Sequence, residues 1–500
     1  MKRTTKLGIA IYLIIFTAVA AISVVLAYKS SLIAQDNFKV YVDTKQVELN
    51  DKSGSNMVPF KYNGETYLPL EPIVNLSGLE CKREKDSTTI GIYDKSGNDP
   101  IINQNPNLKG SLTYTCFNKD LVPLLNKYFK EAYPNIEIKS IITISDIPYF
   151  DKIKSWKNSG SPLPDVIIAE YAQIRKFIDT TDLFADLTDR AKDYVNNMVP
   201  YTIQSGTDKN GVLRALSSDA MPGAIAYKKN VAKKYLGTDD PVKISEMLSR
   251  PKNMLQTAKV LKENSGGKVS LFPGIDEPFR MYLGGRRQGW IMDNKLTIDQ
   301  KVLDYVDFAK TLRSNKYTSG FLQWSPEWSA AISQDETALA WLCPTWGIPW
   351  IIGSNDKKAA DGGRWGLAKP SYPYFWGGTY FGIYSKSPNQ NLAWEFVKFF
   401  TTNKEVMRAL ADNGSLPNSL EAIAEGSPEE NKIVGTDVLK FFEPLVMDIS
   451  SKMTAYDEEI NVYYIDALKL YTDGKIKSKE EMIDTFKKNV KLNLKDIEVQ

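Results

Sequence analysis

The sequence predicts an α/β protein that is preceded by a small β-rich domain and one transmembrane helix. The sequence pattern changes near residue 110, and from there the signals for short apolar strands alternate with those for amphipathic helices. This alternation, with strands as apolar as Val166–Ala169, is typical of a largely parallel, doubly wound sheet. The other two observations are a β-like pattern before residue 95 and an uncharged apolar run at the N-terminus. A chain of 500 residues has room for more than one folding unit.

The apolar run extends from Leu7 to Ala27 and follows a basic flank. It suits a helix that crosses about 30 Å of hydrocarbon, whereas the core of a cleavable signal peptide is usually about 7–15 residues long. We therefore expect residues 1–30 to form a cytoplasmic flank and a membrane anchor, with the body of the protein outside the cell. The small residues Ala18-Val19-Ala20 keep a cleaved signal open as the alternative.

Residues 36–95 predict a small β-rich domain, in which Asn63-Gly64 between two alternating runs is a strong hairpin signal. The segments VYVD and VPFKYNGETYLPLEPIVNLSG resemble the domain named for the N-terminal region of copper amine oxidases, which serves as a stalk on Gram-positive surface proteins. The resemblance implies a spacer or a module that faces the cell wall. No copper role follows, because the chain contains no histidine. Residues 96–110 are rich in Gly, Asn and Pro and predict a linker.

Beyond the linker, strand and helix signals follow one another closely. Pro123 near the start of the first amphipathic segment fits the first turn of a helix, where its missing N–H is not needed. The predicted strands are Ser111–Cys116, Ile136–Ile144 and the VIIA segment, and the predicted helices are Leu121–Tyr133 and Tyr149–Lys157.

Composition excludes several function classes. With no histidine, the chain cannot form a Ser-His-Asp or Cys-His catalytic site or a zinc site with imidazole ligands. Its net charge is +3, and because the first thirty residues hold four basic residues and no acid, the rest has no positive excess. Nucleic acid is therefore not an expected partner. Cys81, Cys116 and Cys343 are far apart, and we expect them to be small apolar core residues.

Tryptophan gathers in one part of the chain. Of the ten tryptophans, eight lie between Trp324 and Trp394, interleaved with Gly, Pro and Tyr. Rigid aromatic rings beside Gly and Pro suit the wall of a small-molecule pocket, although for any single ring a place in the core is the alternative. We expect Trp341 and Trp394 to lie in the core, because the residues around each predict a buried strand or helix face.

The order of segments from about Leu112 to Ile497 resembles the extracellular solute-binding proteins of ABC importers, in particular the sugar-binding class related to maltodextrin binders. The matching segments are Pro164-Asp165-Val166, LFADL, Tyr227-Lys228-Lys229-Asn230, Trp376–Ile383, Ala393–Phe400 and Asn413–Pro417. No cysteine suited to lipid attachment follows the N-terminal span, which departs from the family pattern.

The resemblance implies a two-lobed periplasmic-binding-protein-like α/β fold with crossing strands, in which the ligand binds between the lobes and a hinge motion closes them. We place lobe one at 108–218 plus 372–447 and lobe two at 219–371 plus 448–500. Pro370–Pro373 lies near the expected return crossing from lobe two to lobe one, so its prolines also suit a hinge.

The same resemblance implies which residues contact the ligand. Carboxylates would accept from sugar hydroxyls, and aromatic rings would stack on the apolar face of the sugar. Arg280 is expected to be a solvated or ion-paired surface group. The candidate ligand-binding residues are Trp346, Trp376, Glu170, Tyr171, Glu277, Phe279, Tyr380 and Asp219.

The sequence therefore predicts a membrane-tethered extracellular receptor, not an enzyme, that captures a carbohydrate and passes it to the transmembrane subunits of an ABC permease, with no cofactor or metal. Arg280, Arg286 and Arg287 also leave an anionic ligand open in place of a neutral sugar. Two alternative functions stay open. One is a glycosidase whose paired carboxyl groups come from Glu170, Asp219 and Glu277. The other is a surface sensor that reports the ligand to a signalling partner.

Overall fold

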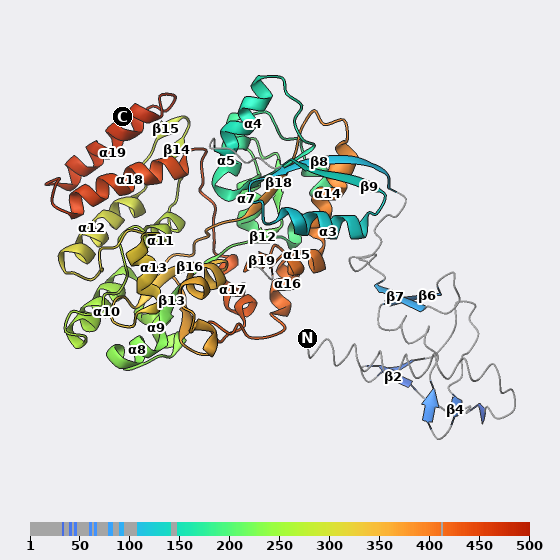
Figure 1. Cartoon of the computed structure of the whole chain (residues 1–500), viewed down its shortest axis with the longest axis horizontal. Coiled ribbons are helices and arrows are strands. Elements are labelled where there is room, and N and C mark those ends of the chain that lie inside the picture. The colour runs from blue at the N-terminus through green and yellow to red at the C-terminus, as the bar shows by residue number, and fades with distance from the viewer. Residues whose placement is uncertain are drawn as a thin grey trace. The chain divides into compact units, whose positions relative to one another are not determined.

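The computed structural model describes residues 108–141, 148–411 and 414–500, together with the backbone of short strands between residues 33 and 94 (Figure 1). The chain divides into two compact units, Met1–Gln104 and Asn105–Gln500. In the part of the chain that is described, no helix is long and apolar enough to cross a membrane. The predicted anchor within residues 1–30 and most of the predicted linker lie outside the described residues.

The first unit contains short antiparallel strand pairs. Tyr62 is paired with Glu65 and Phe60 with Tyr67, which confirms the predicted antiparallel pairing on either side of Asn63-Gly64, two residues that lie outside the described part. The rest of the predicted stalk lies outside the described residues. The strands are β1 Ile33–Ala34, β2 Val40–Val42, β3 Lys45–Val47, β4 Phe60–Tyr62, β5 Glu65–Tyr67, β6 Leu79–Arg83 and β7 Ile90–Asp94.

A five-stranded sheet in the order β11-β18-β10-β8-β9 forms the centre of lobe one. β8 runs parallel to both β9 and β10, as predicted, but β18 lies antiparallel between β10 and β11. The reason is that Ser217, where the chain leaves this sheet, is paired with Tyr380, where the chain has just returned to it. The strands are β8 Gly110–Cys116, β9 Ile136–Ile141, β10 Val166–Glu170, β11 Ala215–Ser217 and β18 Thr379–Ile383.

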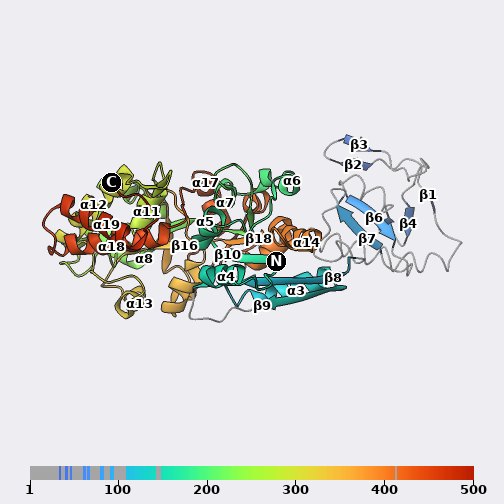
Figure 2. The ribbon, with the colours of Figure 1, turned by 90° about the horizontal axis from the view of Figure 1, so that it is seen from above.

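Helices cover this sheet and bury its apolar residues. In Figure 2, β8 and β9 run side by side with α3 against them. Phe129 of α3 packs edge-on against Phe396 of α14, with ring centroids 4.9 Å apart. The helices within the ranges predicted for lobe one are α3 Val122–Ala132, α4 Tyr149–Asn158, α5 Tyr171–Thr180, α6 Thr188–Ala191, α7 Pro200–Gly206, α14 Gln390–Thr402, α15 Lys404–Ala411, α16 Leu420–Glu425 and α17 Val438–Val446.

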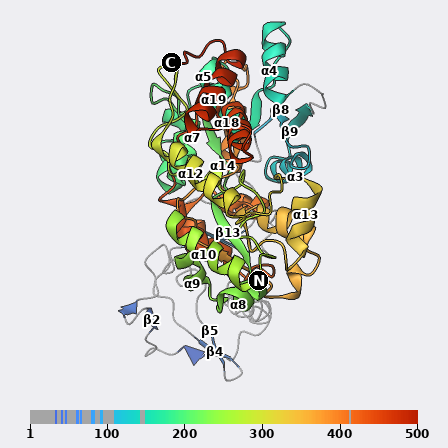
Figure 3. The same cartoon turned by 90° about the vertical axis from the view of Figure 1, so that its left-hand side faces the viewer.

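Lobe two is built on a three-stranded antiparallel sheet in the order β16-β13-β17. Helices α18 and α19 lie side by side on this lobe (Figure 3). The strands are β13 Gly223–Lys228, β16 Ala340–Pro344 and β17 Trp365–Ala368, beside the hairpin of β14 Ile291–Met292 and β15 Lys295–Leu296. The helices are α8 Lys229–Leu236, α9 Pro241–Met247, α10 Pro251–Asn264, α11 Phe279–Gly284, α12 Gln300–Ser314, α13 Pro326–Ser333, α18 Asp457–Thr472 and α19 Lys479–Asn493.

Crossing segments connect the two lobes. The outgoing and return segments run antiparallel, because Gly223 N–H donates to the carbonyl of Tyr374 (2.8 Å) and Trp376 N–H donates to the carbonyl of Met221 (2.9 Å). At Gly223 a Cβ would lie 2.0 Å from the Tyr374 ring, so only glycine fits at this close approach. A short strand pair, β12 Asp219–Ala220 with β19 Leu416–Pro417, lies beside the crossing.

The core contains the residues predicted for it within the described part of the chain. Trp341, Trp394, Cys116 and Cys343 are all buried. The side chain of Cys81 lies outside the described residues. The lobe ranges given above stay predictions.

Candidate functional site

Three tryptophans form a surface beside the crossing segments, which we call the tryptophan wall: Trp324, Trp346 and Trp376. The rings of Trp324 and Trp346 are nearly parallel, with an interplanar angle of 17° and centroids 6.3 Å apart. Trp376 meets Trp346 edge-on at 5.1 Å and Trp324 at 5.8 Å. Trp324 is 55% exposed and Trp376 only 6% exposed, so the wall has a solvent-facing outer ring and a buried inner one.

The ends of secondary-structure elements position the wall. Trp346 comes two residues after the end of β16, and its indole Nε1 donates to the carbonyl of Trp376 (2.6 Å). Trp376 is held in turn by the outgoing crossing segment through its backbone N–H. Trp324 has a left-handed backbone with φ of 69°, which is rare for a bulky residue, and it precedes Ser325, the N-cap of α13. The exposed indole of Trp324 is therefore held by a strained backbone conformation, a feature that is common at functional sites.

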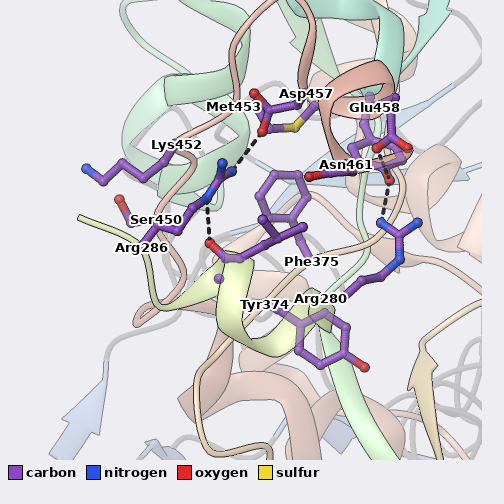
Figure 4. Close-up of a pocket in the computed structure, with 13 residues that line it drawn as sticks. Arg280, Arg286, Tyr374, Phe375, Ser450, Lys452, Met453, Asp457, Glu458 and Asn461 are labelled. Carbon is purple, nitrogen blue, oxygen red and sulfur yellow. Dashed lines mark hydrogen bonds and ion pairs between the residues drawn. The ribbon is translucent and has the colours of Figure 1, made fainter. Parts of the chain in front are cut away.

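Arg280 links the wall to a polar group that bridges the lobes. Its guanidinium carbon lies 4.0 Å from the centroid of Trp376, a cation–π contact. Its Nη1 donates to the Tyr171 hydroxyl (3.0 Å), which donates to Oε1 of Glu458 (3.1 Å). In Figure 4 the Arg280 side chain points toward Glu458. The prediction that Arg280 is a solvated or ion-paired surface group was wrong, because the guanidinium packs on Trp376 and donates to Tyr171. Both partners are distant from Arg280 in the sequence.

Glu170 and Tyr171 come from lobe one, where β10 ends and α5 begins. Burial, followed by the nearby Glu458 carboxylate, raises the pKa of Glu170 to about 7, and Arg280 opposes this rise. Glu170 therefore changes charge near neutral pH beside a second carboxylate from the other lobe. The ion pair between Lys176 and Glu459 joins the same two helices, α5 and α18.

Two of the candidate residues, Asp219 and Tyr380, are buried beside the segments that cross between the lobes. Asp219 is 8% exposed, and its Oδ1 accepts from the backbone N–H of Thr379 (2.8 Å). Burial raises the pKa of Asp219 to about 6. Tyr380 lies next to Thr379 on β18 and is fully buried. The structure thus places both residues behind the site, where the outgoing strand meets the returning one.

Glu277 and Phe279 lie inside lobe two. Phe279 stacks on Tyr464 of α18, with centroids 4.7 Å apart and rings 12° from parallel. Glu277 is fully buried, and neither carboxylate oxygen has a hydrogen-bond partner in the described structure. Burial raises the pKa of Glu277 well above its usual range. Because Glu277 and Asp219 are both buried, these two do not form a pair of accessible carboxyl groups such as a glycosidase needs.

The geometry of the site does not identify the protein family, but a match to a family model does. The model of the bacterial extracellular solute-binding proteins matches residues 125–436, which is more than half of the chain. The chain belongs to this family. A search of curated proteins gives no match for this solute-binding protein.

Solved structures share the fold of this solute-binding protein. The galacto-N-biose/lacto-N-biose I-binding protein of a Bifidobacterium longum ABC transporter is 19% identical, with a TM-score of 0.60 over 78% of this chain and 99% of that chain. The GacH receptor of Streptomyces glaucescens is 19% identical, with a TM-score of 0.59 over 78% and 100%. The sugar-binding protein MalE of Xanthomonas citri is 13% identical, with a TM-score of 0.61 over 77% and 98%. At these identities the likeness establishes the two-lobed fold.

Sequence reasoning missed three residues of the site. Trp324 was counted in the tryptophan cluster but was not singled out, although the turn-forming Gly320 and the N-cap Ser325 around it were visible signals. Arg280 was noted beside the Glu277-Pro278-Phe279 motif but was expected at the surface, and Glu458 had no signal in the sequence. Glu458 is the second residue of an ordinary amphipathic helix, and only the packing of α18 against α11 and α5 brings it to the site.

We expect Glu170→Gln to flatten the pH dependence of stability of this solute-binding protein. Because the pKa of Glu170 is raised from 4.5 to about 7 in the folded state, the folded protein binds more protons than the unfolded chain between these values. The free energy of unfolding should therefore fall as pH rises from 4.5 to 7, by about 1–3 kcal/mol from this group. Urea unfolding at pH 5 and pH 8 measures the difference.

In this experiment Glu405→Gln, at an exposed glutamate of α15, should keep the wild-type pH dependence. An unchanged slope between pH 5 and pH 8 in Glu170→Gln would show that Glu170 does not titrate near neutral pH.

Proposed function

We propose that this protein captures a carbohydrate between its two lobes and delivers it to the transmembrane subunits of an ABC importer, without catalysing a reaction. The observation that carries the proposal is the tryptophan wall beside the group Glu170, Tyr171, Arg280 and Glu458. Aromatic faces suit the C–H face of a sugar ring, and the guanidinium and carboxylates suit its hydroxyl groups. The polar group takes residues from both lobes, so a ligand bound there would bring the lobes together.

The names of the related structures support a sugar as the ligand. One relative was solved with lacto-N-biose, one with acarbose and one with β-1,6-galactobiose. The proposal also includes a membrane tether at Leu7–Ala27 and a stalk at residues 36–95 that holds the binding lobes away from the membrane. For the ligand, Trp346, Trp376, Glu170 and Tyr171 are the residues of the original candidate set that we propose as contacts, with Arg280, Glu458 and Trp324 added.

A carbohydrate panel tests the proposal. The full chain would be titrated with mono- and disaccharides, including lacto-N-biose, maltose and β-1,6-galactobiose, by calorimetry and by tryptophan fluorescence. We expect at least one sugar to bind with one-to-one stoichiometry and to change the fluorescence, because Trp324 and Trp346 are partly exposed. Trp324→Phe should reduce the fluorescence change. If no sugar gives heat or a fluorescence response, the carbohydrate assignment fails while the fold and the family stand.

A further inference from the structure

A small pocket lies beside the candidate site, on the other side of Phe375. Figure 4 shows Phe375 between Arg280 and Arg286. The pocket has a cavity volume of about 40 Å³, which is enough for a few water molecules or for one compact group. Tyr171, Arg280 and Glu458 line the side that it shares with the candidate site, and Arg286, Ser450 and Lys452 line the far side. The crossing segment that leads into α18 supplies Ser450 and Lys452.

The charged side chains around the pocket leave an excess of positive charge. Asp457 is occupied, because its Oδ2 accepts from Arg286 Nη2 (2.8 Å) and its Oδ1 accepts from the N–H of Thr454 (2.8 Å). Glu458 accepts from the Tyr171 hydroxyl, as described above. Three cations, Arg280, Arg286 and Lys452, line the pocket together with the two carboxylates, so the lining has one positive charge in excess.

Arg286 provides hydrogen-bonding capacity that the fold does not use. It is 7% exposed, and its Nε donates to the carbonyl of Leu283 (3.1 Å). Its Nη1 is buried and has no hydrogen-bond partner in the described structure. A charged donor left without an acceptor costs free energy, so the arrangement is incomplete as it stands. An acceptor that carries negative charge would complete it.

We propose that this pocket binds an oxyanion, a carboxylate or sulfate group, between Arg286, Lys452 and Arg280. A guanidinium presents parallel N–H groups that match two oxygens of such a group, and a lysine adds a point charge. The pocket goes beyond the carbohydrate contacts proposed above. The oxyanion is either a free ion or a group on the solute itself, and the second case rests on the proposed function. Because both lobes contribute to the pocket, an oxyanion there also favours the arrangement in which the lobes are in contact.

Titration of the full chain with sodium sulfate and sodium acetate, at ionic strength held constant with sodium chloride, tests for a free ion. We expect saturable binding in calorimetry and a saturable rise of the unfolding temperature. Arg286→Lys keeps a positive charge opposite Asp457 but removes the guanidinium fork, and it should weaken binding about tenfold or more. Lys452→Ala should weaken binding in the same direction, and Lys491→Ala on the exposed face of α19 should leave it unchanged.

Titration with D-glucuronic acid against D-glucose tests for a group on the solute. Preference for the acid that is lost in Arg286→Lys would assign the pocket to the carboxylate of the solute. The proposal is overturned by two results together. Sulfate and acetate would show the same affinity and the same change in unfolding temperature for the wild type, Arg286→Lys and Lys452→Ala, and glucuronic acid would bind no more tightly than glucose. The neutral sugars of the panel separate this result from the proposed function, because their binding does not need the pocket.

Discussion

Trp376→Ala is expected to lower the affinity for the bound carbohydrate by about a hundredfold or more. The ring of Trp376 carries the Arg280 cation–π contact and supports both other rings of the tryptophan wall. Without it, Trp346 loses its edge-on partner and Arg280 loses the surface that positions it, so the stacking face and the hydroxyl-binding group are disordered together. A hundredfold loss corresponds to about 2.7 kcal/mol, within the range for a buried aromatic anchor.

Calorimetry with a sugar that the panel identifies measures this loss. Because Trp376 is 6% exposed, its removal should also lower the free energy of unfolding by about 3–5 kcal/mol, and binding must be measured well below the unfolding transition. Trp376→Phe keeps an aromatic ring and should retain most of the affinity. Trp350→Ala, at a residue that is 62% exposed, is the matched control. Wild-type affinity in Trp376→Ala would remove the wall from the binding site.

Asp457→Ala is expected to destabilise lobe two by about 3–5 kcal/mol, because it leaves the Arg286 guanidinium buried without its counter-charge. The ion pair is short (2.8 Å), and both side chains are 4% exposed. The carboxylate also accepts from the hydroxyl of Thr454 (2.5 Å), so the loop that starts α18 loses its anchor in the same step. Urea unfolding of the variant measures the change.

A double variant separates the cost of the buried charge from the loss of packing. Arg286→Met combined with Asp457→Ala removes both charges and should recover part of the stability that Asp457→Ala loses. Asp473→Ala breaks an ion pair with Arg313 in which both side chains are more than a third exposed, and it should change stability by no more than about 1 kcal/mol. Equal effects of Asp457→Ala and Asp473→Ala would show that burial of the first pair does not matter.

Local patterns predicted the parts of the fold that depend on neighbours in sequence. The pairing of β4 with β5 was predicted because Asn-Gly between two alternating runs is a signal carried by adjacent residues. The strand Val166–Glu170 is recognisable because its first four residues are apolar and buried, as expected for a strand that is covered on both faces. The antiparallel β18 was not predicted, because strand direction depends on where the chain re-enters the sheet after about 160 residues in and around lobe two.

The site divides in the same way. Trp346 and Glu170 were found because each lies at the end of a strand: Glu170 is the last residue of β10, and Trp346 comes two residues after β16. Glu277 and Phe279 belong to a motif that the sequence shows, yet the structure buries both, because α18 from the end of the chain covers α11. A sequence motif can therefore be recognised without showing whether its residues reach the site, because their exposure depends on how distant helices pack.

By itself the sequence determined the class of this protein: its α/β alternation, the exclusion of histidine-dependent catalysis, and the concentration of tryptophan in one stretch. Only the tertiary structure decided which tryptophans form a surface, that Arg280 lies on Trp376, and that Glu458 is near enough to raise the pKa of Glu170. The physical reason is that composition and periodicity record which residues avoid water. Contacts between side chains more than 100 residues apart depend on how whole elements pack.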